Sequence, residues 1–133
     1  MIDAVLVAEK TVVTAKGDGP PVDVSPASTR VFLLTLHITN IVEQESLEVS
    51  IHGSADGATW APRPSLTFPQ KFYRGDSPLI LDLTAHPDMK FVRAHWEVAR
   101  WGRGQETPMF EFTLSLKEIP AEVLRETATE ARG

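Results

Sequence analysis

Apolar and polar residues alternate with a period of two through most of this chain. Between residues 30 and 39 every second position is apolar, and these positions are Phe32, Leu34, Leu36 and Ile38. The same spacing recurs in residues 46–52, 90–100 and 110–116. Side chains of a β-strand alternate between its two faces, so each of these segments has one apolar face. The pattern predicts an all-β protein.

The first two of these segments are predicted to form a hairpin. A polar stretch at residues 40–45 separates them, which is the place for a turn. Directly opposite residues of an antiparallel pair point to the same face, and a register with Leu36 opposite Val49 satisfies that condition. We therefore expect residues 30–39 and 46–52 to pair with each other.

Shorter segments complete the predicted architecture. Strands are expected within residues 4–15 and 79–83, with a short edge strand near residues 22–24. The proline-rich stretch 61–70 is expected at an edge or in a crossing loop, because proline cannot donate to a ladder. The pair Asp56-Gly57 predicts a tight type I′ turn. In total about seven to nine strands are expected, forming a single antiparallel β-sandwich of jelly-roll or immunoglobulin-like topology.

The last residues differ in character. Pro120 suits a first helical turn, and good helix formers follow it. An isolated helix of this length is marginal in water, so a short docked helix and a flexible tail are both open. The sequence thus divides into a β-sandwich domain, residues 1–118, and a C-terminal helical or flexible extension, residues 119–133.

Composition narrows the classes of function. The chain has 133 residues, which suits a single domain, and it has no cysteine, which excludes disulfides and thiolate metal sites. Its net charge of −5 gives no basic footprint for nucleic acid or for an anionic membrane. We expect no signal peptide, because an acid stands where a basic region is needed, and no membrane span.

No spacing typical of catalysis or metal binding occurs. The four histidines, His37, His52, His86 and His95, match no HxH, HxxxH or HExxH motif. His37 and His52 are expected on the outer face of the predicted hairpin, too far apart to share a metal. The carboxylates are scattered and lie mainly near turns. We therefore expect no enzyme, no cofactor and no metal site, with the histidines as solvated residues of strand faces.

Arginine and aromatic residues near residue 100 suggest an interface. Arg93, Arg100 and Arg103 accompany Trp101 in an otherwise acidic protein, and arginine and aromatics are enriched at protein contacts. Phe91 lies on the same face as Arg93, opposite the apolar face that carries Trp96. The candidate interface is therefore Phe91, Arg93, Arg100, Trp101 and Arg103, in contact with an acidic patch of another copy.

Loop aromatics allow a second interpretation. Trp60, Tyr73 and Trp101 lie at or near predicted turns, where aromatic rings can stack on a sugar or another ligand. They are the candidate ligand-binding residues in this alternative. Covering the open ends of the sandwich would explain them equally well.

Several segments together resemble a known family. They are Thr14 to Gly19, Val22 to Val24, Leu34 to Thr39, Leu47 to Trp60, Phe91 to Trp96 and Phe110 to Leu114. In this order they resemble the small β-sandwich proteins encoded among the virion structural genes of tailed bacteriophages and prophages. The resemblance implies a non-enzymatic, self-associating homo-oligomer, with other structural proteins of a particle as further partners. It also implies a protein that is cytoplasmic before assembly, or virion-associated. The segment from Pro62 to Ser77 and the extension after Lys117 depart from this family.

A partial resemblance covers residues 47–96. A strand, Ser-x-Asp-Gly-x-Thr-Trp and Phe-Val-Arg-Ala are similar to discoidin-like jelly-roll modules. That family implies binding of carbohydrates or lipid head groups. We rank this carbohydrate- or ligand-binding function second.

Overall fold

The structure is a computed structural model that describes residues 2–41, 45–71, 74–100 and 109–124, with the backbone alone at Lys10, Glu45, Ala99 and Arg100. The described residues form nine strands: β1 (Asp3–Val13), β2 (Gly17–Asp18), β3 (Val22–Asp23), β4 (Val31–Ile41), β5 (Glu45–Ser54), β6 (Leu66–Thr67), β7 (Gly75–Asp82), β8 (Phe91–Arg100) and β9 (Phe110–Glu118). The predicted all-β class and the number of strands are confirmed.

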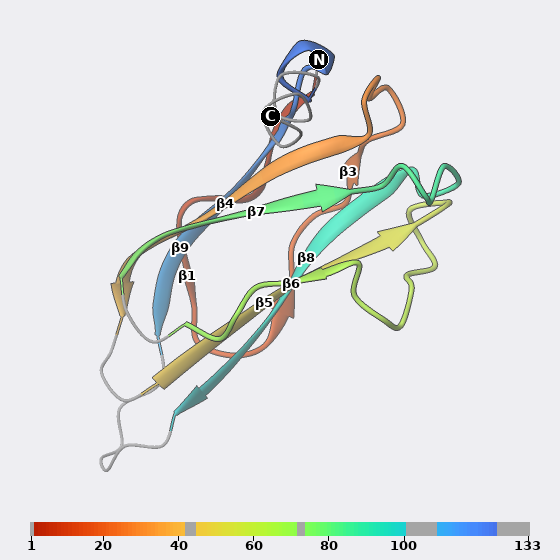
Figure 1. Ribbon diagram of the computed structural model, residues 1–133. Coiled ribbons are helices and arrows are strands. Elements are labelled where there is room, and N and C mark those ends of the chain that lie inside the picture. Colours follow the sequence, from red (N-terminus) through yellow and green to blue (C-terminus); the bar gives the residue numbers. More distant parts are fainter. Residues whose placement is uncertain (1, 42–44, 72–73, 101–108, 125–133) are drawn as a thin grey trace.

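The strands form two antiparallel sheets that lie as two layers (Figure 1). The first sheet has the order β1-β9-β4-β7, and the second has the order β2-β8-β5-β6, with β3 also paired to β8. If β2 and β3 are counted as one interrupted strand, the first strand pairs with the last, the second with the second to last, and so on inward to β5 with β6. This is a long hairpin folded over into two sheets, which is the jelly-roll topology.

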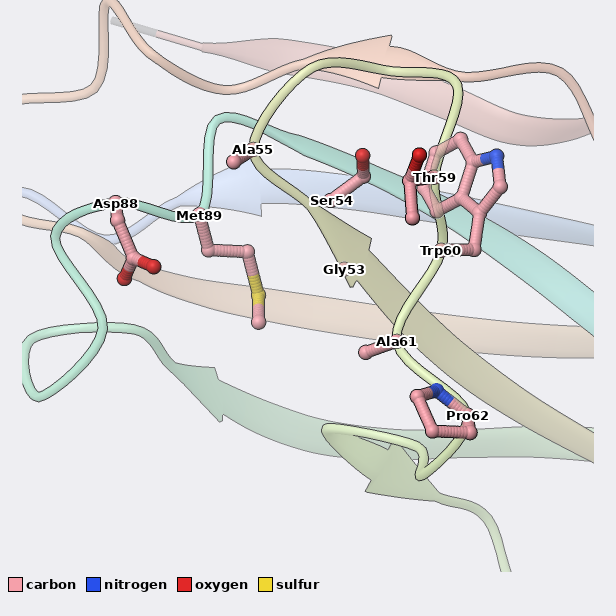
Figure 2. A pocket seen from close by; sticks show the side chains of 9 residues that line it. All are labelled: Gly53, Ser54, Ala55, Thr59, Trp60, Ala61, Pro62, Asp88 and Met89. Carbon is pink, nitrogen blue, oxygen red and sulfur yellow. The ribbon is translucent and has the colours of Figure 1, made fainter.

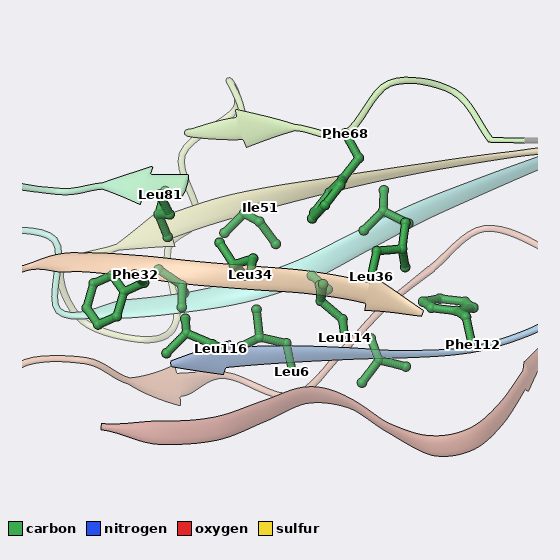
Figure 3. Packing of buried hydrophobic residues seen from close by; sticks show 14 of the residues in the cluster. Leu6, Phe32, Leu34, Leu36, Ile51, Phe68, Leu81, Phe112, Leu114 and Leu116 are labelled. Carbon is green, nitrogen blue, oxygen red and sulfur yellow. The ribbon is translucent and has the colours of Figure 1, made fainter. Parts of the chain in front are cut away.

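A continuous apolar core lies between the sheets (Figure 3). The inward residues of β4 and β9 come from the first sheet, and those of β5 and β8 from the second, as their alternation predicts. Phe68, just after β6, also points into this core and is 1% exposed. The largest fully buried side chains are Phe32, Phe68, Phe110, Phe112, Leu6, Leu34, Leu36, Leu47, Ile51, Leu81, Leu83 and Leu114.

An irregularity in β1 brings the two sheets close together at one corner. The register of β1 against β9 shifts between Val5 and Val7, so Leu6 and Val7 both point inward. A bulge of this kind bends the strand. Gly19 lies against it: a Cβ added to Gly19 would stand 2.6 Å from the Leu6 carbonyl oxygen, and the Gly19 N–H donates to the Ala94 carbonyl. Only glycine fits there without a backbone shift.

The predicted hairpin of residues 30–39 with 46–52 is wrong. Leu36 lies opposite Ser77 and Leu114 in the first sheet, whereas Val49 lies opposite Trp96 in the second. Each of the two strands has one apolar face, and both apolar faces are buried in the same core although the strands belong to different sheets. Alternation therefore cannot distinguish a neighbour in the same sheet from a strand across the core.

The type I′ turn at Asp56-Gly57 is also wrong in its geometry. The chain does turn there, but only Gly57 has a positive φ, of 80°. Asp56 instead accepts hydrogen bonds at Oδ1 from the N–H groups of Ala58 and Thr59, at 2.9 and 2.8 Å. The turn is therefore held by hydrogen bonds from the backbone to the Asp56 side chain, and it does not have the two positive φ angles of a type I′ turn.

Proline has the expected effect on the strands. The stretch 61–70 contributes only β6, at an edge of the second sheet. The strand expected at residues 79–83 begins earlier, at Gly75, and includes Pro78. This is possible because β7 is an edge strand, where a missing N–H costs no ladder hydrogen bond.

A helical turn follows the last strand. Residues 121–124 are helical, and the Leu124 N–H donates to the Pro120 carbonyl at 3.2 Å. This confirms a short C-terminal helix after the sandwich.

Candidate functional site

The outer face of the second sheet brings several polar side chains of β5 and β8 together. Leu47, Val49 and Ile51 point inward from β5, so the residues between them point outward. In the β5–β8 register His52 lies opposite Arg93, and Ser50 lies opposite His95. We call these four residues, with Asp18 of β2 and Trp60, the polar face.

Asp18 anchors His95. The two residues lie opposite each other in the β2–β8 register, and His95 Nδ1 is 2.8 Å from Asp18 Oδ1. A carboxylate only accepts, so the Nδ1–H of His95 donates. Both side chains are partly exposed, at 30% and 41%.

His52 is anchored from the other side of the strand pair. Its Nδ1 is 2.9 Å from the Ala61 carbonyl oxygen, so here too the Nδ1–H must donate. The Nε2 of the neutral ring is then an acceptor, and Ser50 Oγ donates to it at 3.3 Å. The His52 and His95 rings lie 5.8 Å apart between centroids, at 88°.

Arg93 is already engaged within the chain. Its guanidinium carbon lies 4.4 Å from the centroid of the Trp60 ring, within the range of a cation–π contact. Its Nε lies 3.8 Å from Asp18 Oδ1. Phe91, two residues earlier, is half-buried, and a Cβ added to Gly57 would lie 3.4 Å from its ring. The loop after β5 thus covers both residues.

The loop of residues 55–61 is braced by its own hydrogen bonds. Ser54 Oγ donates to Asp56 Oδ1 and accepts from the Gly57 N–H, both at 2.9 Å. Hydrogen bonds from the Thr59 and Ala58 N–H groups, with that from Ser54, lower the pKa of Asp56 from 3.8 to about 2. This bracing holds Trp60 over Arg93.

A shallow hollow lies beside Trp60 (Figure 2). It holds about 290 Å³ and is lined by Trp60, Thr59 and Pro62 on one side and by Asp88 and Met89 on the other. Met89 reaches towards Gly53 of β5, and a Cβ added to Gly53 would stand 2.0 Å from the Met89 sulfur. The hollow is mostly apolar, with a carboxylate at its rim.

Some of the predicted site residues contact each other, and others lie outside the described residues. Arg93 and Trp60, predicted for different roles, come together. Tyr73, Trp101 and Arg103 lie outside the described residues, as does the side chain of Arg100. Sequence reasoning missed the pairing of Asp18 with His95, because the two are 77 residues apart. It also missed the proximity of His95 to His52.

The outer face of the first sheet is different. Leu33 of β4 and Ile80 of β7 lie directly opposite each other and are 36% and 50% exposed. Val5 of β1, 49% exposed, adds a third apolar side chain on this face. At the far end of the β4–β7 pair, His37 contacts Asp76 through Nδ1. His37 and His52 therefore lie on opposite outer faces, and the prediction that one hairpin carries both is wrong.

Glu118 is the most buried carboxylate of the described chain, and its role is structural. It is 2% exposed and accepts hydrogen bonds from the N–H groups of Ile2, Ser28 and Thr29 at 3.0 to 3.2 Å. Burial alone would raise the pKa of Glu118, but these hydrogen bonds outweigh it and leave the pKa below 4.5. Glu118 ties the start of β1 and the loop before β4 to the end of β9.

No family model matches the sequence, and no curated protein matches it. Within residues 2–41, 45–71, 74–100 and 109–124, no group of three or more histidines and carboxylates is arranged to hold a metal ion. In the same ranges no helix has the length and apolar character of a membrane span.

Proposed function

We propose that this protein is a non-enzymatic structural component whose jelly-roll units associate with one another, of the kind found in virions of tailed phages. The observation that carries the proposal is the adjacent pair Leu33 and Ile80 on the outer face of the first sheet. Apolar residues scattered singly on a surface are ordinary, but neighbouring ones that extend across a sheet favour a contact.

The occupant of this face is a second copy of the chain. A two-fold contact places the same patch of both copies together, so Leu33 and Ile80 of one copy meet those of the other. Lys117 of β9 lies opposite Leu33, on the side of β4 away from β7. Asp82 lies in β7, two residues after Ile80. A rim with both signs of charge around an apolar centre suits such a self-complementary contact.

Sedimentation velocity over a range of protein concentrations tests this proposal. The wild-type chain is expected to form a concentration-dependent oligomer, and Ile80→Glu or Leu33→Glu to shift it towards the monomer, because a charge would be buried at the contact. Thr67→Glu adds the same charge to an exposed residue of the second sheet and should leave the oligomer intact. A wild-type chain that is monomeric throughout would overturn the proposal.

The segment from Arg100 to Arg103 is a proposed second contact, resting on its sequence. Its arginines and Trp101 would meet an acidic patch of a neighbouring copy, in a contact that salt weakens. The double variant Arg100→Glu, Arg103→Glu should lose assembly at low salt. An oligomer that is unchanged in this variant at both high and low salt would remove the segment from the interface.

Ligand binding at the hollow is the second candidate function. It is favoured by Trp60, which lines the hollow together with Asp88, a pairing of aromatic ring and polar group that suits a sugar. A glycan array is the direct test. Binding that is abolished by Trp60→Ala, in a chain that remains monomeric, would favour this function over self-association.

A further inference from the structure

We propose that His52 and His95 form a surface site for a divalent transition-metal ion, with Nε2 of each ring as a ligand. This inference goes beyond the proposed structural role and does not depend on it. It departs from the expectation, based on sequence alone, that no metal site exists.

The spacing of the two rings suits a shared ion. His52 and His95 are diagonal neighbours on the polar face, because Ser50, two residues before His52, lies opposite His95. An imidazole nitrogen binds zinc at about 2.0–2.1 Å, which puts the centroids of two rings on one ion about 5–6 Å apart. The observed separation of 5.8 Å falls within this range.

The hydrogen bonds of both rings select the tautomer that a metal ligand needs. Nδ1–H of His95 donates to Asp18, and Nδ1–H of His52 donates to the Ala61 carbonyl. The lone pair of each neutral ring is therefore on Nε2. A second hydrogen bond from the distal ring N–H to a carboxylate or a carbonyl is the usual support of a histidine that binds a metal.

The two anchors lie on opposite sides of the β5–β8 strand pair. Asp18 is in β2, on the side of β8 away from β5, whereas the Ala61 segment flanks β5, since its N–H donates to the Gly53 carbonyl. Neither anchor lies between the two strands. Ser50 Oγ, 3.3 Å from His52 Nε2, gives up its hydrogen bond to this nitrogen when the ion takes its place.

The surrounding charge allows a cation. Arg93 lies directly opposite His52, but its guanidinium stacks on Trp60 and its Nε lies 3.8 Å from the Asp18 carboxylate, which offsets its charge. One row further along, Glu48 and Glu97 lie directly opposite each other and add negative charge. Two imidazoles leave the other positions of the ion to water or to a ligand, so the site is labile and selects ions that prefer nitrogen.

Titration of the untagged chain with copper, nickel and zinc chloride, followed by calorimetry, tests the site. One ion per chain is expected, with copper bound most tightly. His52→Gln and His95→Gln should each lower the affinity more than tenfold, and Asp18→Asn, which removes an anchor, by about 10- to 100-fold. The electron paramagnetic resonance spectrum of the copper complex should show two nitrogen ligands, and one in either histidine variant.

His37→Gln is the matched control. His37 also pairs with an aspartate, Asp76, but it lies on the other sheet. This variant should bind the ion with the affinity of the wild-type chain. The circular dichroism spectra of all variants should match that of the wild-type chain, which shows that each variant is folded. Equal affinity in wild type, His52→Gln and His95→Gln would overturn the proposal, as would an equal loss in His37→Gln.

Discussion

The two sheets share one core but present opposite outer faces. The inner residues of β4 and of β5 are equally apolar and equally buried, for example Leu34 and Leu47, both 0% exposed. Outward, the first sheet exposes the apolar pair Leu33 and Ile80 besides the His37–Asp76 pair. The second sheet exposes two imidazoles, an arginine and carboxylates across β5 and β8. Burial constrains the inner faces alike, so the outer faces carry what differs between the sheets, and function is to be sought there.

The largest expected effect comes from the inner faces of the two sheets, where equivalent substitutions should destabilise the protein to a similar extent. Leu34→Ala in the first sheet and Leu47→Ala in the second should each lower the free energy of unfolding by about 2–5 kcal/mol, since each leaves a cavity in the shared core. Urea unfolding followed by circular dichroism measures this effect. Leu33→Ala, the outward neighbour of Leu34, is the control and should cost much less. A similar loss in all three variants would mean that the outer face of the first sheet is not exposed.

Glu118 should make the first sheet acid-sensitive. Glu118→Gln removes a charged acceptor from three backbone N–H groups and should cost about 1.5–3 kcal/mol at neutral pH. The folded-state pKa of Glu118 lies below 4.5, so the unfolded chain binds more protons in that range. Its contribution is complete above about pH 4.5 and is lost as the pH falls through the folded-state pKa.

Chemical unfolding at a series of pH values checks this prediction. The difference in stability between wild type and Glu118→Gln should shrink as the pH falls below 4.5. Glu122→Gln, at an exposed residue of the helical turn, should leave stability unchanged at every pH. A constant difference between wild type and Glu118→Gln from pH 7 to pH 3 would contradict the proposed role of the carboxylate.

On the second sheet, the contact of Trp60 with Arg93 should have a smaller effect. Trp60→Ala should cost about 0.5–1 kcal/mol through the lost cation–π contact, and Trp60→Phe, which keeps a ring, should cost less. A double-mutant cycle with Arg93→Ala isolates the pair, because each single variant removes the same contact. Additive effects of the two single variants would show that the ring and the guanidinium do not interact.

The smallest expected effect has the opposite sign. Glu48 and Glu97 lie directly opposite each other on β5 and β8, and like charges in this position repel. Glu48→Gln should therefore raise the free energy of unfolding by about 0.2–0.5 kcal/mol, and more at low salt. Thermal unfolding at two salt concentrations measures it, with Glu122→Gln as the control. A stabilisation that does not depend on salt would need another cause.

Much of the fold could be predicted because it depends on local alternation. The faces of β4, β5, β8 and β9 follow from which residues are apolar, and the edge position of β6 follows from the prolines around it. Alternation could not show that β4 and β5 do not pair, because two apolar faces are buried equally well in neighbouring strands of one sheet and in strands that face each other across the core. Similarly, Asp56-Gly57 indicated a turn, but the hydrogen bonds of Asp56 decided its type.

The candidate site was less predictable. Trp60 and Arg93 each had a signal, as a loop aromatic and as an arginine on a strand, but nothing local indicated that they stack. Asp18, His95 and His52 come from three strands, and no sequence motif joins them. Two imidazoles become neighbours only after the register of β5 against β8 is set.

By itself the sequence determined which sides of β4, β5, β8 and β9 are buried, because their apolar residues alternate with the period of a strand. Tertiary structure decided which strands are neighbours, and hence which outward side chains lie within contact distance. The reason is that pairing between strands that are far apart in the chain, such as β1 and β9, depends on how the whole long hairpin folds over its core. Local residue patterns contain no information about that folding.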